Sequence, residues 1–264
     1  KYKIFISKLS NISAKRNLGS KQFASEYLAF IDSDAYPINS WLSIGLKYFE
    51  TEKIIVLGGP SGIPFKDEEE KYLISNYAKR SFFCTANLSK RKYSRNNHYF
   101  DWLESCNFII KKSAFDKVGG MNENQYIFED LELCSKINKE YGKGKILFAG
   151  DLIVYHKDRN IKNFLKQRFV YGMFIFEALQ QSNSFGKITS LIPLIFSIIF
   201  LLFFINFYSY IKFYYILFFL VLLCFFIFYL DLRKFKLKFI FLCKVFILTI
   251  FANVAFVSGN LLSF

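Results

Sequence analysis

The sequence predicts an α/β domain with a mainly parallel sheet and flanking helices, followed by helices that cross a membrane. In the first part of the 264-residue chain, short apolar runs alternate with helical patterns, an order typical of parallel sheets. The last ~75 residues are dominated by Phe, Leu and Ile, in runs close to the ~20 residues that span a hydrocarbon core. The chain therefore combines a domain in water with a region in lipid.

The strands are predicted from short apolar runs that end in turn residues. The run 27–31 stops at a pair of aspartates, and the run 54–57 stops at Gly58-Gly59-Pro60. We interpret these glycines as a turn, because the Lys and the Ser or Thr of a phosphate-binding loop do not follow them. Further strands are expected at residues 4–6, 108–110, 146–149 and 152–155.

Helices are predicted where a capping residue precedes an apolar pattern or a glycine follows it. Asn39 or Ser40 caps a helix that ends near Phe49, and Gly142 ends another. Residues 61–100 are polar and aromatic, and we expect them to form a surface excursion near the substrate. The other expected helices lie between residue 19 and Ser25 or Glu26, and over 113–118, 129–141 and 161–181.

The change in composition predicts three regions, namely an α/β domain over 1–160, an amphipathic linker over 161–186 and a membrane region over 187–264. In the linker, apolar residues recur at helical spacing among basic ones, so this helix can lie in the membrane interface. The alternative is a surface helix packed on the domain. The expected membrane spans are 188–206, 213–230 and 239–257.

Loop charge predicts the orientation in the membrane. The connection between the second and third spans carries Arg233, Lys234, Lys236 and Lys238, whereas the first connection has only Lys212. By the positive-inside rule, the more basic connection is cytoplasmic. The α/β domain then lies on the cytoplasmic side of a multi-pass protein of the inner (cytoplasmic) cell membrane.

The charge and the cysteines exclude several classes of protein. Lys and Arg number 35 against 21 Asp and Glu, and the net charge of +14 suits phosphorylated substrates or anionic lipids; the alternative is the drift of an AT-rich genome. No nucleic-acid partner is expected, because the basic residues form no stripe and no binding motif is present. Five cysteines without a C-x-x-C pair argue against a disulfide framework and a zinc site, and two histidines exclude a multi-histidine metal centre.

Two aspartates after the strand 27–31 form the sharpest candidate site. Asp32 and Asp34 stand one residue apart at the carboxyl end of a buried strand, where ligands gather in α/β sheets. Their carboxylates can hold a hard divalent cation, which in turn binds a diphosphate. The alternative is a turn in which both side chains bond local amides.

Glu129-Asp130 and His156 are two further candidates. Asp130 lies in the first turn of an expected helix, where its carboxylate can take a proton from an attacking hydroxyl. Alternatively, both carboxylates only stabilise the positive end of the helix. His156 follows a strand and precedes charged residues, a setting in which the role of a metal ligand competes with a structural role.

In this order, the motifs resemble those of the inverting glycosyltransferases of family 2, which have the GT-A fold. Residues 13–19, SAKRNLG, are similar to the donor-side Arg-Asn-x-Gly stretch of that family. Residues 28–34, LAFIDSD, resemble its strand and D-x-D metal motif. Asn107 to Gly120, followed by Glu129-Asp130, is similar to its acceptor-side segment and E-D motif, and Gln167-Arg168 to the basic helix of membrane-linked members.

The resemblance, which covers roughly residues 1–180, implies a mechanism and a set of site residues. Asp130 would act as the general base on an acceptor hydroxyl, and Mn²⁺ or Mg²⁺ would bind the diphosphate of a nucleotide-sugar donor. The resemblance assigns the metal to Asp32, Asp34 and His156, the donor to Arg16, Asn17, Asp32 and Arg168, and the acceptor side to Glu129 and Asn107.

The expected activity is non-processive transfer of one sugar to a lipid-linked or nascent glycan acceptor at the cytoplasmic membrane face, in the synthesis of cell-surface polysaccharide or glycoconjugates. Gln167-Arg168 lacks the Trp of the Q-x-x-R-W motif of processive synthases, and three spans are few for such an enzyme. The first strand of the family and its base-contacting Asp are not found, so we expect an N-terminal part before Lys1 to be missing. Two alternatives stay open, a polyprenyl-phosphate glycosyltransferase and a non-catalytic membrane scaffold.

Overall fold

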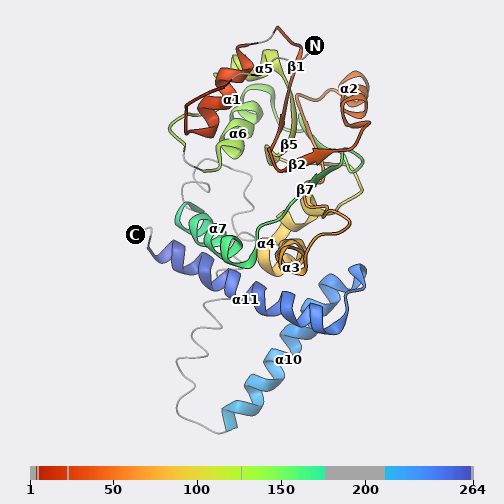
Figure 1. Ribbon diagram of the computed structural model, residues 1–264, viewed down its shortest axis with the longest axis vertical. Coiled ribbons are helices and arrows are strands. Elements are labelled where there is room, and N and C mark those ends of the chain that lie inside the picture. The colour runs from red at the N-terminus through yellow and green to blue at the C-terminus, as the bar shows by residue number, and fades with distance from the viewer. Residues whose placement is uncertain (1–3, 5, 23, 126, 176–211, 263–264) are drawn as a thin grey trace. The chain divides into compact units, whose positions relative to one another are not determined.

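The computed structural model describes residues 4, 6–22, 24–125, 127–175 and 212–262 (Figure 1). These residues fall into two compact units. The first contains residues up to 63 and 93–156, and the second contains 64–92, 157–175 and 212–262. The predicted span 188–206 and the end of the predicted helix 161–181 lie outside the described residues. The predicted domain boundaries stay a prediction.

The first unit is an α/β domain. Its strands are β1 (Tyr27–Ile31), β2 (Ala35–Pro37), β3 (Val56–Gly58), β4 (His98–Tyr99), β5 (Asn107–Lys111), β6 (Ile146–Phe148) and β7 (Val154–His156). Its helices are α1 (Ile12–Ser20), α2 (Trp41–Thr51), α5 (Lys112–Lys117) and α6 (Glu129–Tyr141). The predicted α/β architecture is therefore confirmed.

The main sheet of this unit has the strand order β1-β5-β3-β6-β4. β3 and β6 are parallel, whereas β5 pairs antiparallel with both β1 and β3, and β4 pairs antiparallel with β6. The sheet is therefore mixed in the described residues, with β1, β3 and β6 running in one direction. The carboxyl ends of these three strands meet at the end of the sheet where β5 begins. A separate two-stranded ladder joins β2 to β7.

Side chains of the sheet alternate between two helical layers. Ile109 of β5 lies against α2, where a side chain at Gly45 would collide with it, so the glycine allows the helix to approach. Phe108, next along the strand, contacts Phe30 of β1 at 6.1 Å between ring centroids, and Phe30 also packs on Phe115 of α5. The sheet is thus buried on both faces and forms a rigid base for the loops at its end.

The first helix differs from the prediction. We expected it after residue 19, but α1 covers Ile12–Ser20. The reason is Asn11, whose side-chain oxygen accepts a hydrogen bond of 2.9 Å from the amide of Ala14 and caps the helix. Arg16 and Asn17 consequently lie on a helix, with fixed directions for their side chains.

The second unit is helical. Its elements are α3 (Glu70–Arg80), α4 (Phe82–Thr85), η1 (Ala86–Lys92), α7 (Ile161–Met173), α10 (Lys212–Leu232), η4 (Arg233–Phe235) and α11 (Phe239–Leu261). The expected surface excursion is wrong for residues 64–92, because Ile74, Ala78 and Cys84 belong to a core that includes α10 and α11. The polar pattern misled because Arg80 is buried with its guanidinium 4.8 Å from the ring of Tyr77.

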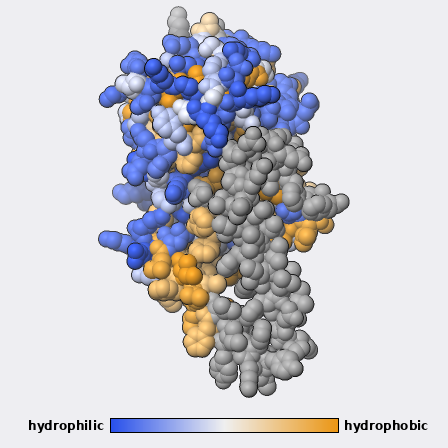
Figure 2. Space-filling model, turned by 180° about the vertical axis from the view of Figure 1, so that it is seen from behind, coloured by the Kyte–Doolittle hydropathy of each residue, from blue (hydrophilic) through white to orange (hydrophobic). Residues whose placement is uncertain are grey.

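The C-terminal apolar runs form helices where the structure describes them. Within those residues, α11 alone has the length and apolar composition that would let a helix cross a membrane. Figure 2 shows a mainly hydrophilic surface on the first unit, whereas apolar side chains gather on the second. Exposed apolar residues of α10 and α11 include Phe219, Phe226, Phe239 and Phe251. The multi-pass topology and its orientation stay predictions.

Candidate active site

Three predicted metal ligands lie together at the end of the main sheet. Asp32 and Asp34 occupy the tight connection from β1 to β2, and the ladder places Ala35 of β2 opposite His156 of β7. The Nε2 atom of His156 lies 3.3 Å from Oδ1 of Asp34 and 3.9 Å from Oδ2 of Asp32. The β2–β7 ladder thus joins residues that are far apart in the sequence.

The donor set of these residues fits a divalent cation. One ligand atom from each of Asp32, Asp34 and His156 lies within 4.8 Å of the other two. Two carboxylates and an imidazole form a set that Mn²⁺ or Mg²⁺ can use, with carboxylate oxygen as the preferred ligand. The side chain of Asp34 is 61% exposed, so a diphosphate can reach a cation there from solvent. We call these three residues the acidic triad.

Arg16 joins the two acidic motifs of the sequence. Its Nη2 lies 3.2 Å from Oδ1 of Asp32, and its Nη1 lies 2.9 Å from Oε1 of Glu129. The side chain is 11% exposed, and its guanidinium also lies 5.8 Å from the ring centroid of Phe30. Because one planar fork binds both carboxylates, the D-x-D and E-D segments flank a single side chain.

Asp130 differs from the triad in its surroundings. Its Oδ2 accepts a hydrogen bond of 3.1 Å from the backbone amide of Ser105. The pKa of Asp130 is raised to about 7, mainly by burial and further by the negative charges of Glu129 and Glu104. The Ser105 hydrogen bond and the positive charge of Arg16 act in the opposite direction. A carboxylate with a pKa near 7 is a far better proton acceptor than an ordinary Asp with a pKa of about 3.9.

The residue before the E-D motif has an unusual backbone. Phe128 has φ 64° and ψ 28°, in the left-handed region that aromatic residues rarely adopt, and it is buried. Strain of this kind often accompanies functional sites. Here it stands directly before the two carboxylates that begin α6, and no sequence pattern indicated it.

Two predicted binding residues have structural contacts instead. The side-chain amide of Asn17 donates to the Met121 carbonyl at 2.8 Å, and its oxygen accepts from the Met121 amide at 2.9 Å. Asn107 is 1% exposed; it donates to the carbonyls of Pro60 and Leu152 and accepts from the indole of Trp41. A donor contact by Asn17 and an acceptor contact by Asn107 stay predictions that these bonds do not favour.

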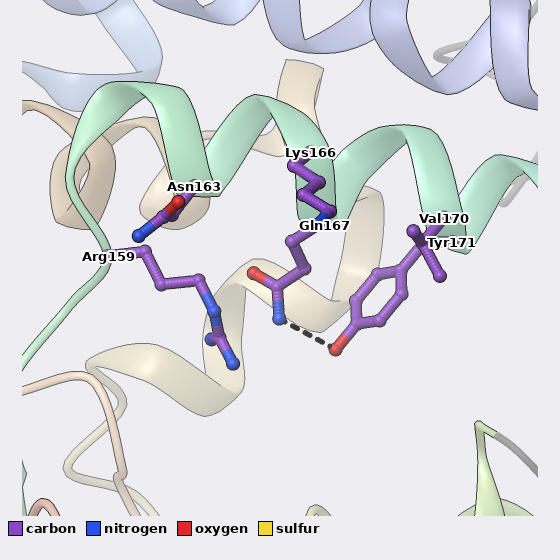
Figure 3. A pocket seen from close by; sticks show the side chains of 6 residues that line it. All are labelled: Arg159, Asn163, Lys166, Gln167, Val170 and Tyr171. Carbon is purple, nitrogen blue, oxygen red and sulfur yellow. Dashed lines mark hydrogen bonds between the residues drawn. The ribbon is translucent and has the colours of Figure 1, made fainter.

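Arg168 and Gln167 lie on α7, in the second unit. Arg168 is buried, with its guanidinium 4.7 Å from the ring centroid of Phe256. Gln167 instead lines a groove of about 350 Å³ and donates to the hydroxyl of Tyr171 at 2.9 Å (Figure 3). The other lining residues are Arg159, Asn163, Lys166 and Val170. The donor role predicted for Arg168 stays a prediction.

Sequence reasoning missed the groups that set the properties of Asp130. The Ser105 contact uses a backbone amide, which no residue type signals. Glu104 has its carboxylate held by the hydroxyl of Ser61 at 3.0 Å. Both residues precede β5, whose position beside β1 could have indicated that its first residues share the end of the sheet with the acidic triad.

Comparison with known proteins indicates a family for part of the chain. Residues 3–119 match the family model described as glycosyl transferase family 2. The match includes Arg16, Asp32 and Asp34, and it ends before Asp130 and His156. The match supports the resemblance to family 2, and the mixed sheet is consistent with a GT-A fold. The family implies a nucleotide-sugar donor and an acceptor, and divalent cations are common in it.

Two relatives carry the same enzyme class in their names. Both are pre-mycofactocin glycosyltransferases, from Mycobacterium tuberculosis strains CDC 1551 / Oshkosh and ATCC 25618 / H37Rv. Each is 23% identical to this chain over 162 residues, which cover 61% of this chain and 33% of the relative. The similarity therefore spans about a third of the length of these relatives.

Proposed function

We propose that this chain is an inverting, non-processive glycosyltransferase. It transfers one sugar from a nucleotide-sugar donor to a hydroxyl of a lipid-linked or nascent glycan at the cytoplasmic face of the membrane. The observation that carries the proposal is the fork of Arg16, which bonds Asp32 of the acidic triad on one side and Glu129, next to Asp130, on the other. A phosphate-binding group and a proton acceptor are thereby held at a short, fixed separation.

The chemistry of the proposal is a single displacement. Asp130 takes the proton of the acceptor hydroxyl as its oxygen attacks the anomeric carbon, and the bond from that carbon to the diphosphate breaks. Attack from the face opposite the diphosphate inverts the anomeric centre. Asp32, Asp34 and His156 would hold a divalent cation, whose positive charge would stabilise the departing diphosphate. The raised pKa of Asp130 supports its role, because a base works best when its pKa is close to the working pH.

The test is a comparison of Asp130→Asn with the parent protein. The full-length protein is first screened against a panel of nucleotide sugars for Mn²⁺-dependent hydrolysis and transfer. We expect Asp130→Asn to keep its donor affinity and to lose transfer by at least ~100-fold, the scale of general-base loss. Asp116→Asn is the matched control, because Asp116 is a half-exposed carboxylate of α5 paired with Lys112.

Two outcomes would favour the alternatives. An undiminished rate of Asp130→Asn would favour a polyprenyl-phosphate acceptor, because a phosphate oxygen needs no strong base. A parent protein that binds no nucleotide sugar in the presence of Mn²⁺ would favour a scaffold without catalysis. Either result would contradict the proposed role of Asp130.

A further inference from the structure

Helix α11 has two different faces. One face carries exposed apolar side chains that are between 45% and 72% accessible and recur every three, four or seven residues. This apolar stripe consists of Ile240, Ile247, Phe251, Val254 and Leu261. Lys244 and Ser258 are the exposed polar residues at intervening positions. The regular spacing places the apolar stripe along one side of the helix, interrupted by Lys244 and Ser258.

The other face of α11 packs on α3 and α7 of the second unit, in the apolar core that contains Ile74 and Phe164. At the edge of the stripe, Lys244 forms an ion pair with Glu70 of α3. The side chain of Asn253 donates to the carbonyl of Phe83 at 3.0 Å. Further along, Phe256 lies under the guanidinium of Arg168 of α7. These contacts attach α11 to helices of the second unit that carry charged residues.

The contact between α7 and α11 is backbone to backbone. A side chain at Gly172 of α7 would collide with the Phe256 carbonyl, and one at Gly259 of α11 would collide with the Phe169 carbonyl. The two glycines therefore let the helices touch at a crossing that admits no other residue without movement. On its open side, α7 carries the groove with Arg159 and Lys166 (Figure 3).

This packing conflicts with a transmembrane position for α11. Its 23 residues, at about 1.5 Å each, extend for roughly 35 Å, close to the ~30 Å of a hydrocarbon core. If α11 crossed the bilayer, Glu70 and Arg168 would have to enter the hydrocarbon with it, together with the helices that carry them. Charged groups and their helices are costly to place there. We infer that α11 lies in the plane of an anionic membrane surface and presents its apolar stripe to the lipid.

Charge favours lipid over a protein as the partner of the stripe. The four basic residues Arg233, Lys234, Lys236 and Lys238 are all exposed and directly precede α11, next to Phe239, which is 70% exposed. Basic residues beside an exposed apolar helix face are typical of helices bound to anionic membranes. This inference does not rest on the proposed function, because no residue of the acidic triad takes part in it.

Helix α10 provides the contrast. Its exposed side chains include consecutive positions that point in different directions around the helix. They are Val221, Leu222, Leu223, Phe226 and Ile227. These exposed positions therefore do not form a single stripe along the helix, unlike those of α11. The two helices have similar compositions, and their packing distinguishes them.

The test measures the depth of the apolar stripe in a bilayer. A fluorophore is attached to a cysteine at Ile240, Ile247, Val254 or Leu261 in the full-length protein, reconstituted in vesicles that contain phosphatidylglycerol. Quenching by lipids brominated near the headgroup or near the chain end then reports depth. We expect the same shallow depth at all four positions. The parent protein, labelled at its own cysteines, provides the background, and a label at Asp116 of α5 should not be quenched.

Other results would overturn the inference. A depth that rises towards Ile247 and Val254 and falls at both ends would mean that α11 crosses the bilayer. Protection of all four labels from both lipids, with cross-links between copies through the same positions, would mean that a second copy of the chain covers the stripe. A membrane-impermeant thiol reagent gives an independent readout, because cysteines at Lys238 and Leu262 should react from the same side of the membrane.

Discussion

The acidic triad and Asp130 are built from the same kind of group in opposite surroundings. Asp34 is 61% exposed and Asp32 is 35% exposed, beside an imidazole. Asp130 accepts a backbone hydrogen bond and has a pKa raised by burial to about 7. The carboxylates of the triad are open to a cation from solvent, whereas loss of water around Asp130 increases its affinity for a proton. Exposure to solvent thus suits the triad to binding a metal, and burial suits Asp130 to accepting a proton.

Arg16 connects the two clusters physically. It bonds Asp32 and Glu129 at once, so the charge of one guanidinium acts on both clusters. Its charge lowers the pKa of Asp130, although less than burial raises it. Changes at each cluster, and at the link between them, should therefore have separable effects.

The largest effect is expected at the exposed cluster. Asp34→Ala should weaken Mn²⁺-dependent binding of a nucleoside diphosphate by at least ~100-fold, since even second-shell changes cost 10–100-fold in metal affinity. Isothermal titration calorimetry measures this directly. Asp116→Ala should bind the nucleoside diphosphate as tightly as the parent does, because Asp116 forms its ion pair with Lys112 of the same helix. Equal affinities for Asp34→Ala and the parent would mean that the triad does not bind the metal.

The next effect concerns pH and the buried cluster. Asp130 works as a base only when deprotonated, so with a pKa of about 7 the value of kcat/KM should rise about 50-fold from pH 5 to pH 7 and level off above. A rate profile between pH 5 and pH 9, with Mn²⁺ binding measured separately at each pH, provides the check. A flat profile would mean that Asp130 is not the group that limits the reaction.

The same titration should affect stability with a defined sign. Because the pKa of Asp130 is higher in the folded protein than in the unfolded chain, the folded state binds the proton more tightly. The contribution of Asp130 to stability is therefore present at low pH and is lost as the pH rises from about 4 to about 7. The melting temperature of Asp130→Asn, relative to that of the parent, should therefore rise as the pH increases over this range. A constant difference between the two would contradict the raised pKa.

A smaller effect is expected at the link between the clusters. Arg16→Lys keeps a positive charge but cannot bond both carboxylates with one planar fork, so we expect kcat/KM to fall ~10-fold without a shift of the pH profile. Arg16→Met removes the charge that lowers the pKa of Asp130 and should also move the profile to higher pH. Identical profiles for the Lys and Met variants would show that the charge of Arg16 does not reach Asp130.

The smallest effect on catalysis is expected at Asn107. Its replacement by Ala leaves the buried indole of Trp41 and the carbonyls of Pro60 and Leu152 without their partner. We expect a loss of about 1–3 kcal/mol in the free energy of unfolding, measured with denaturant, and a nearly unchanged KM for the acceptor. A raised acceptor KM at unchanged stability would restore the acceptor role that the sequence predicted for Asn107.

Local features of the fold could be predicted from the sequence because they depend on local chemistry. The strand 27–31 and the helix 129–141 match β1 and α6, because an apolar run stops at Asp32 and a glycine follows Tyr141. The family motifs were recognised because polar residues follow buried strands in a fixed order. The grouping of Asp32, Asp34 and His156 was implied by the resemblance to family 2 and not by a local pattern, because the β2–β7 ladder brings these residues together from distant positions.

Other features depend on contacts that no local pattern contains. The left-handed backbone of Phe128 and the amide of Ser105 that bonds Asp130 are set by the packing of distant elements. Arg80 is buried on aromatic rings, so its charge indicated a surface that is not there. The strand β5 was predicted, but its antiparallel direction between β1 and β3 was not, because an apolar run carries no sign of its direction.

The short ladder between β2 and β7 has a consequence for folding. It pairs only three residues on each side, from Ala35 with His156 to Pro37 with Val154, and proline cannot donate a hydrogen bond to it. The ladder nevertheless closes a long loop of chain, at a cost in chain entropy that grows slowly with loop length. A cation held across that closure would stabilise it, so the protein should be harder to unfold with the cation bound than without it.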